Sequence, residues 1–163
     1  MKLTEKLNEA FNKQVTAEFE AAMIYRQLSY VFDDMSLTGM RDWMAAHADE
    51  ELGHAADFSK HMLDRDALPQ IGTIEAPGLK IDTPVQAFEA ALAHEQKVSA
   101  MIRELSELAA AEGDSFARPF LDRYLDEQIE EEASVSEILD RLRMVEGDGS
   151  GILRMDAELG AAE

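Results

Sequence analysis

The stretch HADEELGH, residues 47–54, places two histidines and three acidic residues within eight positions. On a helix, His47, Glu51 and His54 would share one face, because residues three and four apart are neighbours there. Met44, one turn earlier, falls on the same face, which indicates that this face is turned towards the protein core. The stretch therefore predicts carboxylate and imidazole groups inside a core, where an unpaired charge is costly.

The composition is that of one folded domain. The 163 residues are 46% hydrophobic and 30% charged, and none is cysteine, which excludes disulfides and thiolate-held metal clusters. The first residues, MKLTEKLNEAF, lack the apolar core of a signal peptide, and no stretch reaches transmembrane length. We therefore expect a cytoplasmic protein.

An excess of acidic residues, 34 against 15 basic ones, gives the chain a net charge of −19. Such a charge repels nucleic acids and anionic membranes, so we expect neither as a partner. It attracts cations, although the same charge can also serve solubility alone.

Apolar residues recur at helical spacing in four long stretches, and no stretch alternates as a strand would. The stretches cover about 4–33, 37–64, 84–113 and 115–146. Short turns join the first pair and the second pair, which predicts two antiparallel hairpins. The 19 residues 65–83 are long enough to cross the bundle, so the second and third helices can run parallel. The predicted fold is an all-α four-helix bundle with a long crossover.

The ends of the predicted helices carry known signals. Thr83 is expected to cap the third helix, with Gln86 closing a capping box, and Gly113 is expected to end it. Pro119 is expected to fix or kink the first turns of the fourth helix.

We expect the bundle to occupy residues 1–146 and residues 147–163 to belong to the same domain. GDGSG, residues 147–151, is predicted to be a flexible break. The residues after it are predicted to form a short fifth helix, which needs a docking surface to be stable.

Each long helix has a mostly apolar stripe that a carboxylate interrupts near its middle. Counted from the hairpin turns, the interruptions lie about 14 to 19 residues away, which puts them at matching heights. We expect six polar side chains to meet there in one layer, called here the central polar layer: Glu18, Glu51, His54, Glu95, Gln128 and Glu131.

The central polar layer holds four carboxylates that would repel one another and, without partners, would take up protons. No lysine or arginine lies on the four stripes to offset them. Two divalent cations would balance the four charges, so the layer predicts a two-metal site. Oxygen-rich ligation with one imidazole suits Fe(II), Mn(II) or Zn(II) better than Ca²⁺ or Mg²⁺. The alternative is that the stripes are misphased and the acids are solvated.

The whole chain resembles the bacterial non-haem ferritins, a branch of the ferritin-like di-iron four-helix-bundle family. The resemblance includes the long crossover and the tail helix, and it departs from the general di-iron pattern where Gln128-x-x-Glu131 replaces Glu-x-x-His. Its sequence segments are EFEAAMIYRQLS (18–29), HADEELGH (47–54), AHEQK (93–97) and DEQIEEE (126–132).

The resemblance implies an iron cofactor in a di-iron centre that Glu51 bridges, with Tyr25 beside it. The residues that match the first iron site are Glu18, Glu51 and His54. Those that match the second are Glu51 and Glu95, with Gln128 and Glu131 close by.

The resemblance also implies a looser third iron site, formed by Glu50, Glu127 and Glu130. These residues are read equally well as part of a solvated acidic run. His47 is interpreted as a packing or supporting histidine rather than a ligand. The remaining polar candidates are interpreted as surface or packing residues: His61, His94 and Glu132.

No haem is expected. The haem-containing sister family, the bacterioferritins, carries a second Glu-x-x-His on the fourth helix and a haem-ligating methionine, whose position here is Leu52. Rubrerythrin-like peroxidases are disfavoured because the chain has no cysteine for their second iron site.

By the same resemblance, the expected function is iron storage and detoxification. Fe(II) is oxidised by O₂ or hydrogen peroxide, and the ferric mineral is kept in a hollow homo-oligomeric shell of about 24 subunits, the family's usual assembly. One alternative is a manganese or iron oxidase or oxygenase acting on an organic substrate, for which Tyr25, Phe58 and Tyr124 leave little room. The other is an acidic structural bundle without metal.

Overall fold

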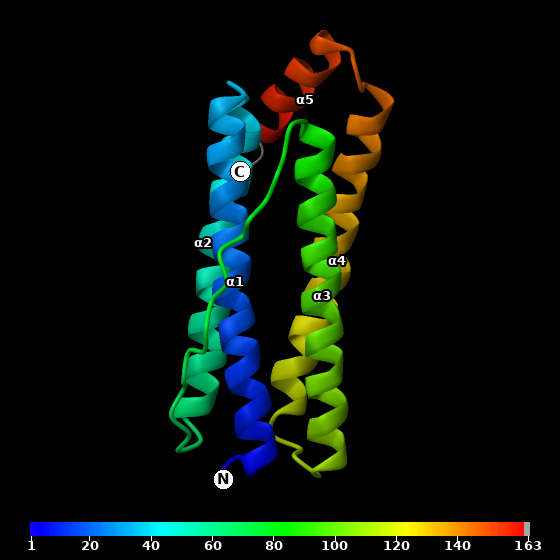
Figure 1. Ribbon diagram of the computed structural model, residues 1–163. Helices are drawn as coiled ribbons and strands as arrows, with labels where there is room; N and C mark the ends of the chain where they lie inside the picture. Colours follow the sequence, from blue (N-terminus) through cyan, green and yellow to red (C-terminus); the bar gives the residue numbers. More distant parts are fainter. Residues whose placement is uncertain (162–163) are drawn as a thin grey trace.

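The computed structural model describes residues 1–161, which form five helices and contain no strand in that range. The four longer helices lie side by side, with the N-terminus at one end of the bundle and the fifth helix at the other (Figure 1). Their bounds are α1 Glu5–Asp34, α2 Thr38–Leu63, α3 Pro84–Ala111, α4 Arg118–Met144 and α5 Gly149–Ala161. The all-α four-helix bundle with a short fifth helix is confirmed. Within the described residues, no helix is both long enough and apolar enough to cross a membrane.

The crossover between α2 and α3 runs along the bundle beside α1, so α2 and α3 are parallel as predicted (Figure 1). Two α1 side chains hold it in place. The Asn12 Oδ1 atom accepts the Gln70 N–H at 2.6 Å, and the Thr16 Oγ1 atom accepts the Gly72 N–H at 2.9 Å.

Thr83 caps α3, since its Oγ1 atom accepts the Gln86 N–H at 3.2 Å. The predicted capping box is wrong in one detail. The Gln86 side chain accepts the N–H of Asp82, at 2.8 Å, rather than that of Thr83, so the reciprocal bond reaches one residue further back than in a capping box. Gly113 has a φ of +70° directly after the last turn, as expected of a residue that ends a helix.

The fourth helix begins at Arg118, three residues later than predicted. The Asp114 Oδ1 atom accepts the N–H groups of Phe116 and Ala117, both at 3.1 Å, and this turn delays the helix. Pro119 lies in the first turn, where its missing N–H costs nothing.

The flexible break predicted at residues 147–151 is shorter than expected, because α5 already begins at Gly149. Gly147, with a φ of +82°, makes the turn, and the Asp148 side chain then accepts the Ser150 N–H at 3.0 Å. Helix α5 docks on α2. We expected the domain to include residues 147–163. Of these, residues 162 and 163 lie outside the described residues.

Two apolar clusters fill the bundle above and below its middle. One contains Phe32, Met40, Met44 and Phe88, and the other is formed by residues such as Phe58. Along the helices, the central polar layer falls between the residues of these two clusters, which sets the site at mid-bundle.

Candidate metal centre

The central polar layer draws its side chains from all four long helices. Five of its six members are buried, and the Glu131 side chain is 15% exposed. The 3.6-residue repeat of each helix turns these side chains inwards together with the apolar residues of the same stripe. By element they are Glu18 on α1, Glu51 and His54 on α2, Glu95 on α3, and Gln128 and Glu131 on α4.

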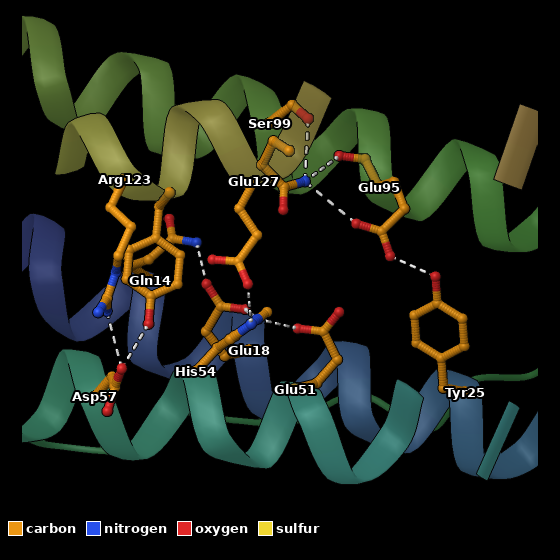
Figure 2. A network of polar contacts seen from close by, with 12 residues as sticks. Gln14, Glu18, Tyr25, Glu51, His54, Asp57, Glu95, Ser99, Arg123 and Glu127 are labelled. Carbon is orange, nitrogen blue, oxygen red and sulfur yellow. Dashed lines mark hydrogen bonds and ion pairs between the residues drawn. The ribbon is translucent and has the colours of Figure 1, made fainter. Parts of the chain in front are cut away.

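One group of ligand atoms joins α1 and α2. Glu18, Glu51 and His54 offer atoms that all lie within 4.8 Å of one another, and they point towards a common centre (Figure 2). The His54 Nδ1 atom lies 3.0 Å from Glu51 Oε2 and 3.9 Å from Glu18 Oε2. Glu18 Oε1 accepts a hydrogen bond from Gln14 at 2.7 Å, whereas Glu18 Oε2 is buried with no partner among the described residues.

The other half of the layer centres on Glu95. Its Oε1 atom accepts a hydrogen bond from the Tyr25 hydroxyl, and its Oε2 atom accepts one from Gln128 Nε2 at 3.2 Å (Figure 2). Gln128 Nε2 also lies 3.1 Å from Ser99 Oγ. Tyr25 therefore lies beside the layer and orients one of its carboxylates.

The electrostatics of the layer favour neutral acids in the absence of a cation. Burial, followed by the nearby charge of Glu51, raises the pKa of Glu18 to about 8 and that of Glu95 to about 7. Burial, followed by the charges of Glu95 and Glu50, raises the pKa of Glu131 to about 8. Such carboxyls hold protons near neutral pH, and a bound cation would displace them.

His54 behaves in the opposite way to an isolated buried histidine. Burial lowers its pKa, but the hydrogen bond and charge of Glu51, together with the charge of Glu18, outweigh burial and raise the pKa to about 9. The ring thus supplies positive charge that a metal ion would replace.

The sequence predicted Glu127 only as a ligand of a third iron site and missed its contact with His54. Glu127 Oε1 lies 3.2 Å from His54 Nε2, so it accepts the proton of the ring nitrogen that faces away from Glu51 (Figure 2). Glu127 lies four residues before Glu131 and therefore on the same face of α4, which is the signal that could have found it.

The residues proposed for a third iron site are only partly brought together. Glu50 and Glu127 have ligand atoms within 4.8 Å of each other and of His54, while the exposed Glu130 is not in that group. The other candidates pack as interpreted. His61 stacks on Phe120 with ring centroids 4.4 Å apart, and His94 is buried.

The donor set of the first group suits a metal ion, whereas Glu95 belongs to no group of three ligand atoms within 4.8 Å of one another among the described residues. Carboxylate oxygens and one imidazole nitrogen converge, an unpartnered carboxylate oxygen faces the centre, and no lysine or arginine among the described residues forms an ion pair with the layer's acids. Hard oxygen donors with one nitrogen fit Fe(II), Mn(II) or Zn(II).

The chain is similar to known proteins over nearly its whole length. A family model described as a ferritin-like domain matches residues 8–145. The bacterial non-heme ferritin of Bacteroides fragilis (strain 638R) is 33% identical over 158 residues, which cover 97% of this chain and 98% of that protein. That of Escherichia coli O157:H7 is 29% identical over 157 residues, covering 96% and 95%. Among solved structures, an open pore ferritin from Archaeoglobus fulgidus superposes with a TM-score of 0.96 at 35% identity, covering 99% of this chain and 100% of that one.

Proposed function

The chain belongs to the ferritin-like family, and we propose that it stores iron after oxidising Fe(II) to Fe(III) at the central polar layer. The observation that carries the proposal is the unpartnered, buried Glu18 Oε2 atom beside Glu51 and His54. A buried carboxylate oxygen without a donor is costly, and a cation in the layer would remove that cost.

In this proposal Fe(II) is the substrate and the layer binds two ions. Glu18, Glu51 and His54 hold one ion, and Glu51 bridges to the second, which Glu95 also binds. Gln128 and Glu131 complete the second site. Holding two ions in one water-restricted layer prepares them to give electrons to the same oxidant, O₂ or hydrogen peroxide.

Supporting side chains fix the ligands. Glu127 accepts the Nε2 proton of His54, which leaves the Nδ1 lone pair free to face the metal. The Tyr25 hydroxyl orients Glu95, and Gln14 orients Glu18. As Fe(II) binds, the acids with raised pKa values release their protons, so binding strengthens as the pH rises.

The family also suggests the setting of the reaction. We propose a homo-oligomeric shell of about 24 subunits in the cytoplasm, without haem, in which a net charge of −19 concentrates Fe(II). Glu50, Glu127 and Glu130 are proposed to hold a third, looser iron ion on the way to the stored mineral.

An organic substrate is less well supported. Tyr25, Phe58 and Tyr124 are at most 1% exposed and pack beside the layer, where a substrate of a di-metal oxidase would have to bind. This packing favours metal ions and small oxidants.

The test is anaerobic Fe(II) loading followed by air, monitored by ferric absorbance. Wild type should oxidise about two Fe(II) per chain rapidly, the number a two-metal site holds. The double variant Glu51→Ala/His54→Ala should lose this phase. The matched control, Glu107→Ala/His61→Ala, changes the same residue types outside the layer and should retain it. A wild type no faster than buffer would refute the proposal and leave the oxidase and metal-free structural alternatives.

A further inference from the structure

A second cluster of ligand atoms lies one helical turn from the main group. His47 and Glu50 on α2 and Glu131 on α4 offer atoms that all lie within 4.8 Å of one another. His47 Nε2 lies 3.8 Å from Glu131 Oε2. Two ligands that each bind an ion at about 2.1 Å lie roughly 3–4 Å apart, so small side-chain movements would close a site here.

Two contacts hold the His47 ring in an orientation that suits a metal ligand. Its Nδ1 atom lies 2.9 Å from the Trp43 carbonyl oxygen, which can only accept, so Nδ1 carries the proton. The ring stacks on the Trp43 indole with centroids 3.6 Å apart. The Nε2 atom is therefore the nitrogen that is aimed at Glu131, and in the neutral ring it is the one that can bind an ion. Metal-binding histidines commonly have this arrangement, with one nitrogen donating to a backbone carbonyl and the other free for the ion.

No lysine or arginine among the described residues forms an ion pair with Glu50 or Glu131. In the chain from residue 1 to 161, the one ion pair of Glu131 is with His47, and Glu50 forms none with lysine or arginine. A divalent cation would balance both carboxylates at once.

The cluster can be reached from solvent. A pocket of about 340 Å³ lies between α2 and the end of α5, and its walls include Asp42, Trp43, His47 and Glu50. On its inner side the cluster shares Glu131 with the central polar layer. The pocket therefore leads to the cluster, and the cluster adjoins the central polar layer.

We propose that His47, Glu50 and Glu131 bind a divalent first-row metal ion at a further position, which shares Glu131 with the layer and Glu50 with the proposed third iron site. One nitrogen and two carboxylates suit Fe(II) or Zn(II) better than Ca²⁺ or Mg²⁺. The site is a waiting position from which an ion passes to the layer through Glu131. Binding stands on the cluster alone, whereas the delivery of Fe(II) rests on the proposed function.

The test uses Zn²⁺, which binds without being oxidised, on the metal-free full-length protein. Crystals soaked in Zn²⁺ should give an anomalous peak about 2.0–2.2 Å from His47 Nε2 and from the carboxylates of Glu50 and Glu131. In solution, calorimetry of His47→Gln should show one fewer Zn²⁺ per chain, or an affinity at that site lower by at least about tenfold. The peak among Glu18, Glu51 and His54 should persist.

His61→Gln is the matched control, because His61 stacks on Phe11 and Phe120 and belongs to neither metal-ligand cluster. It should keep every peak. Glu50→Ala serves as a second variant in case His47→Gln does not fold. Glu50 is exposed, so its replacement should leave the fold intact. It should also weaken the anomalous peak at His47.

A wild-type crystal with zinc in the layer but none at His47 would overturn the inference, as would an unchanged peak in His47→Gln. These outcomes are independent of iron oxidation. A protein that binds zinc at His47 but oxidises no Fe(II) would refute the proposed function and leave the binding site intact.

Discussion

Buried carboxylates lie at the ends of this bundle and at its middle, and their surroundings differ. At one end, the Asp156 Oδ1 atom of α5 accepts the Met40 N–H at 2.8 Å, and at the other Arg65 lies 2.6 Å from Asp114. At the middle, Glu18 faces Glu51 and a histidine, and one of its oxygens has no partner among the described residues. A buried acid with a donor stabilises the fold, whereas acids that face one another mark a place for a ligand.

The pKa values express the same contrast. Burial alone would raise the pKa of Asp114, but the hydrogen bonds of Arg65 and of the Ala117 N–H hold it below its usual value. At mid-bundle, burial and the charge of Glu51 together raise the pKa of Glu18 to about 8. Ionisation of Asp114 therefore stabilises the folded state, whereas ionisation of Glu18 destabilises it.

The largest expected effect comes from breaking the partnered end. Arg65→Met leaves Asp114 without its guanidinium in a place where both side chains are less than 10% exposed. We expect the free energy of unfolding to fall by about 3 kcal/mol, because the Asp114 carboxylate loses its ion-pair partner and keeps only two backbone N–H donors. Urea denaturation measures it. Lys60→Met, which breaks the exposed pair with Asp64, is the control and should change stability by less than about 1 kcal/mol. Equal losses in the two variants would show that burial adds nothing to the contribution of the Arg65–Asp114 pair.

The next effect, in the metal-free protein, is a loss of stability with rising pH. Below about pH 4.5 Glu18 is protonated in both states, but between that pH and about 8 only the unfolded chain releases its proton. The raised pKa values of Glu95, Glu131 and His54 act in the same direction. The free energy of unfolding, measured by urea denaturation at each pH, should therefore fall steadily across this window.

Two comparisons isolate the layer's share of this pH dependence. Glu18→Gln should make the decline shallower, while Glu107→Gln, on the exposed face of α3, should leave it unchanged. Saturating Zn²⁺ should abolish or reverse the decline, since it displaces the protons. An identical decline in wild type and Glu18→Gln would show that general charge repulsion, rather than the layer, sets the slope.

The middle of the bundle was more predictable than its supporting contacts. Helical spacing and the two hairpin turns fix both the face and the height of Glu18, Glu51 and Glu95, so their convergence follows from counting residues. The pairing of His54 with Glu127 depends on side-chain rotamers across two helices, which spacing does not specify. The predicted third site groups Glu127 with Glu50 and Glu130, whereas the structure brings Glu127 together with Glu50 and His54.

That α5 needs a docking surface is predictable from the sequence, but the position of that surface is not. A short helix requires a surface, but the contact of Asp156 with Met40 joins residues 116 positions apart, and no local pattern encodes such a distance. The close approach of Gly39 and Gly160, where a Cβ on Gly39 would lie 1.8 Å from the Asp156 carbonyl oxygen, likewise appears only in three dimensions.

The smallest expected effect tests the other partnered end, where α5 supplies a helix cap from a distance. Leu37, at the start of α2, makes no side-chain capping bond, and the Asp156 carboxylate accepts the Met40 N–H in its place. Asp156→Ala should lower the free energy of unfolding by about 1 kcal/mol, as the loss of a helix N-cap does. Asp156→Asn keeps an acceptor oxygen and loses only its charge near the positive end of the helix dipole, so it should cost about half as much or less. Urea denaturation of both variants separates the two contributions. If Asn were as damaging as Ala, the carboxylate would act through its charge, and this end of the bundle would resemble the middle, where charge rather than hydrogen bonding decides what each acid does.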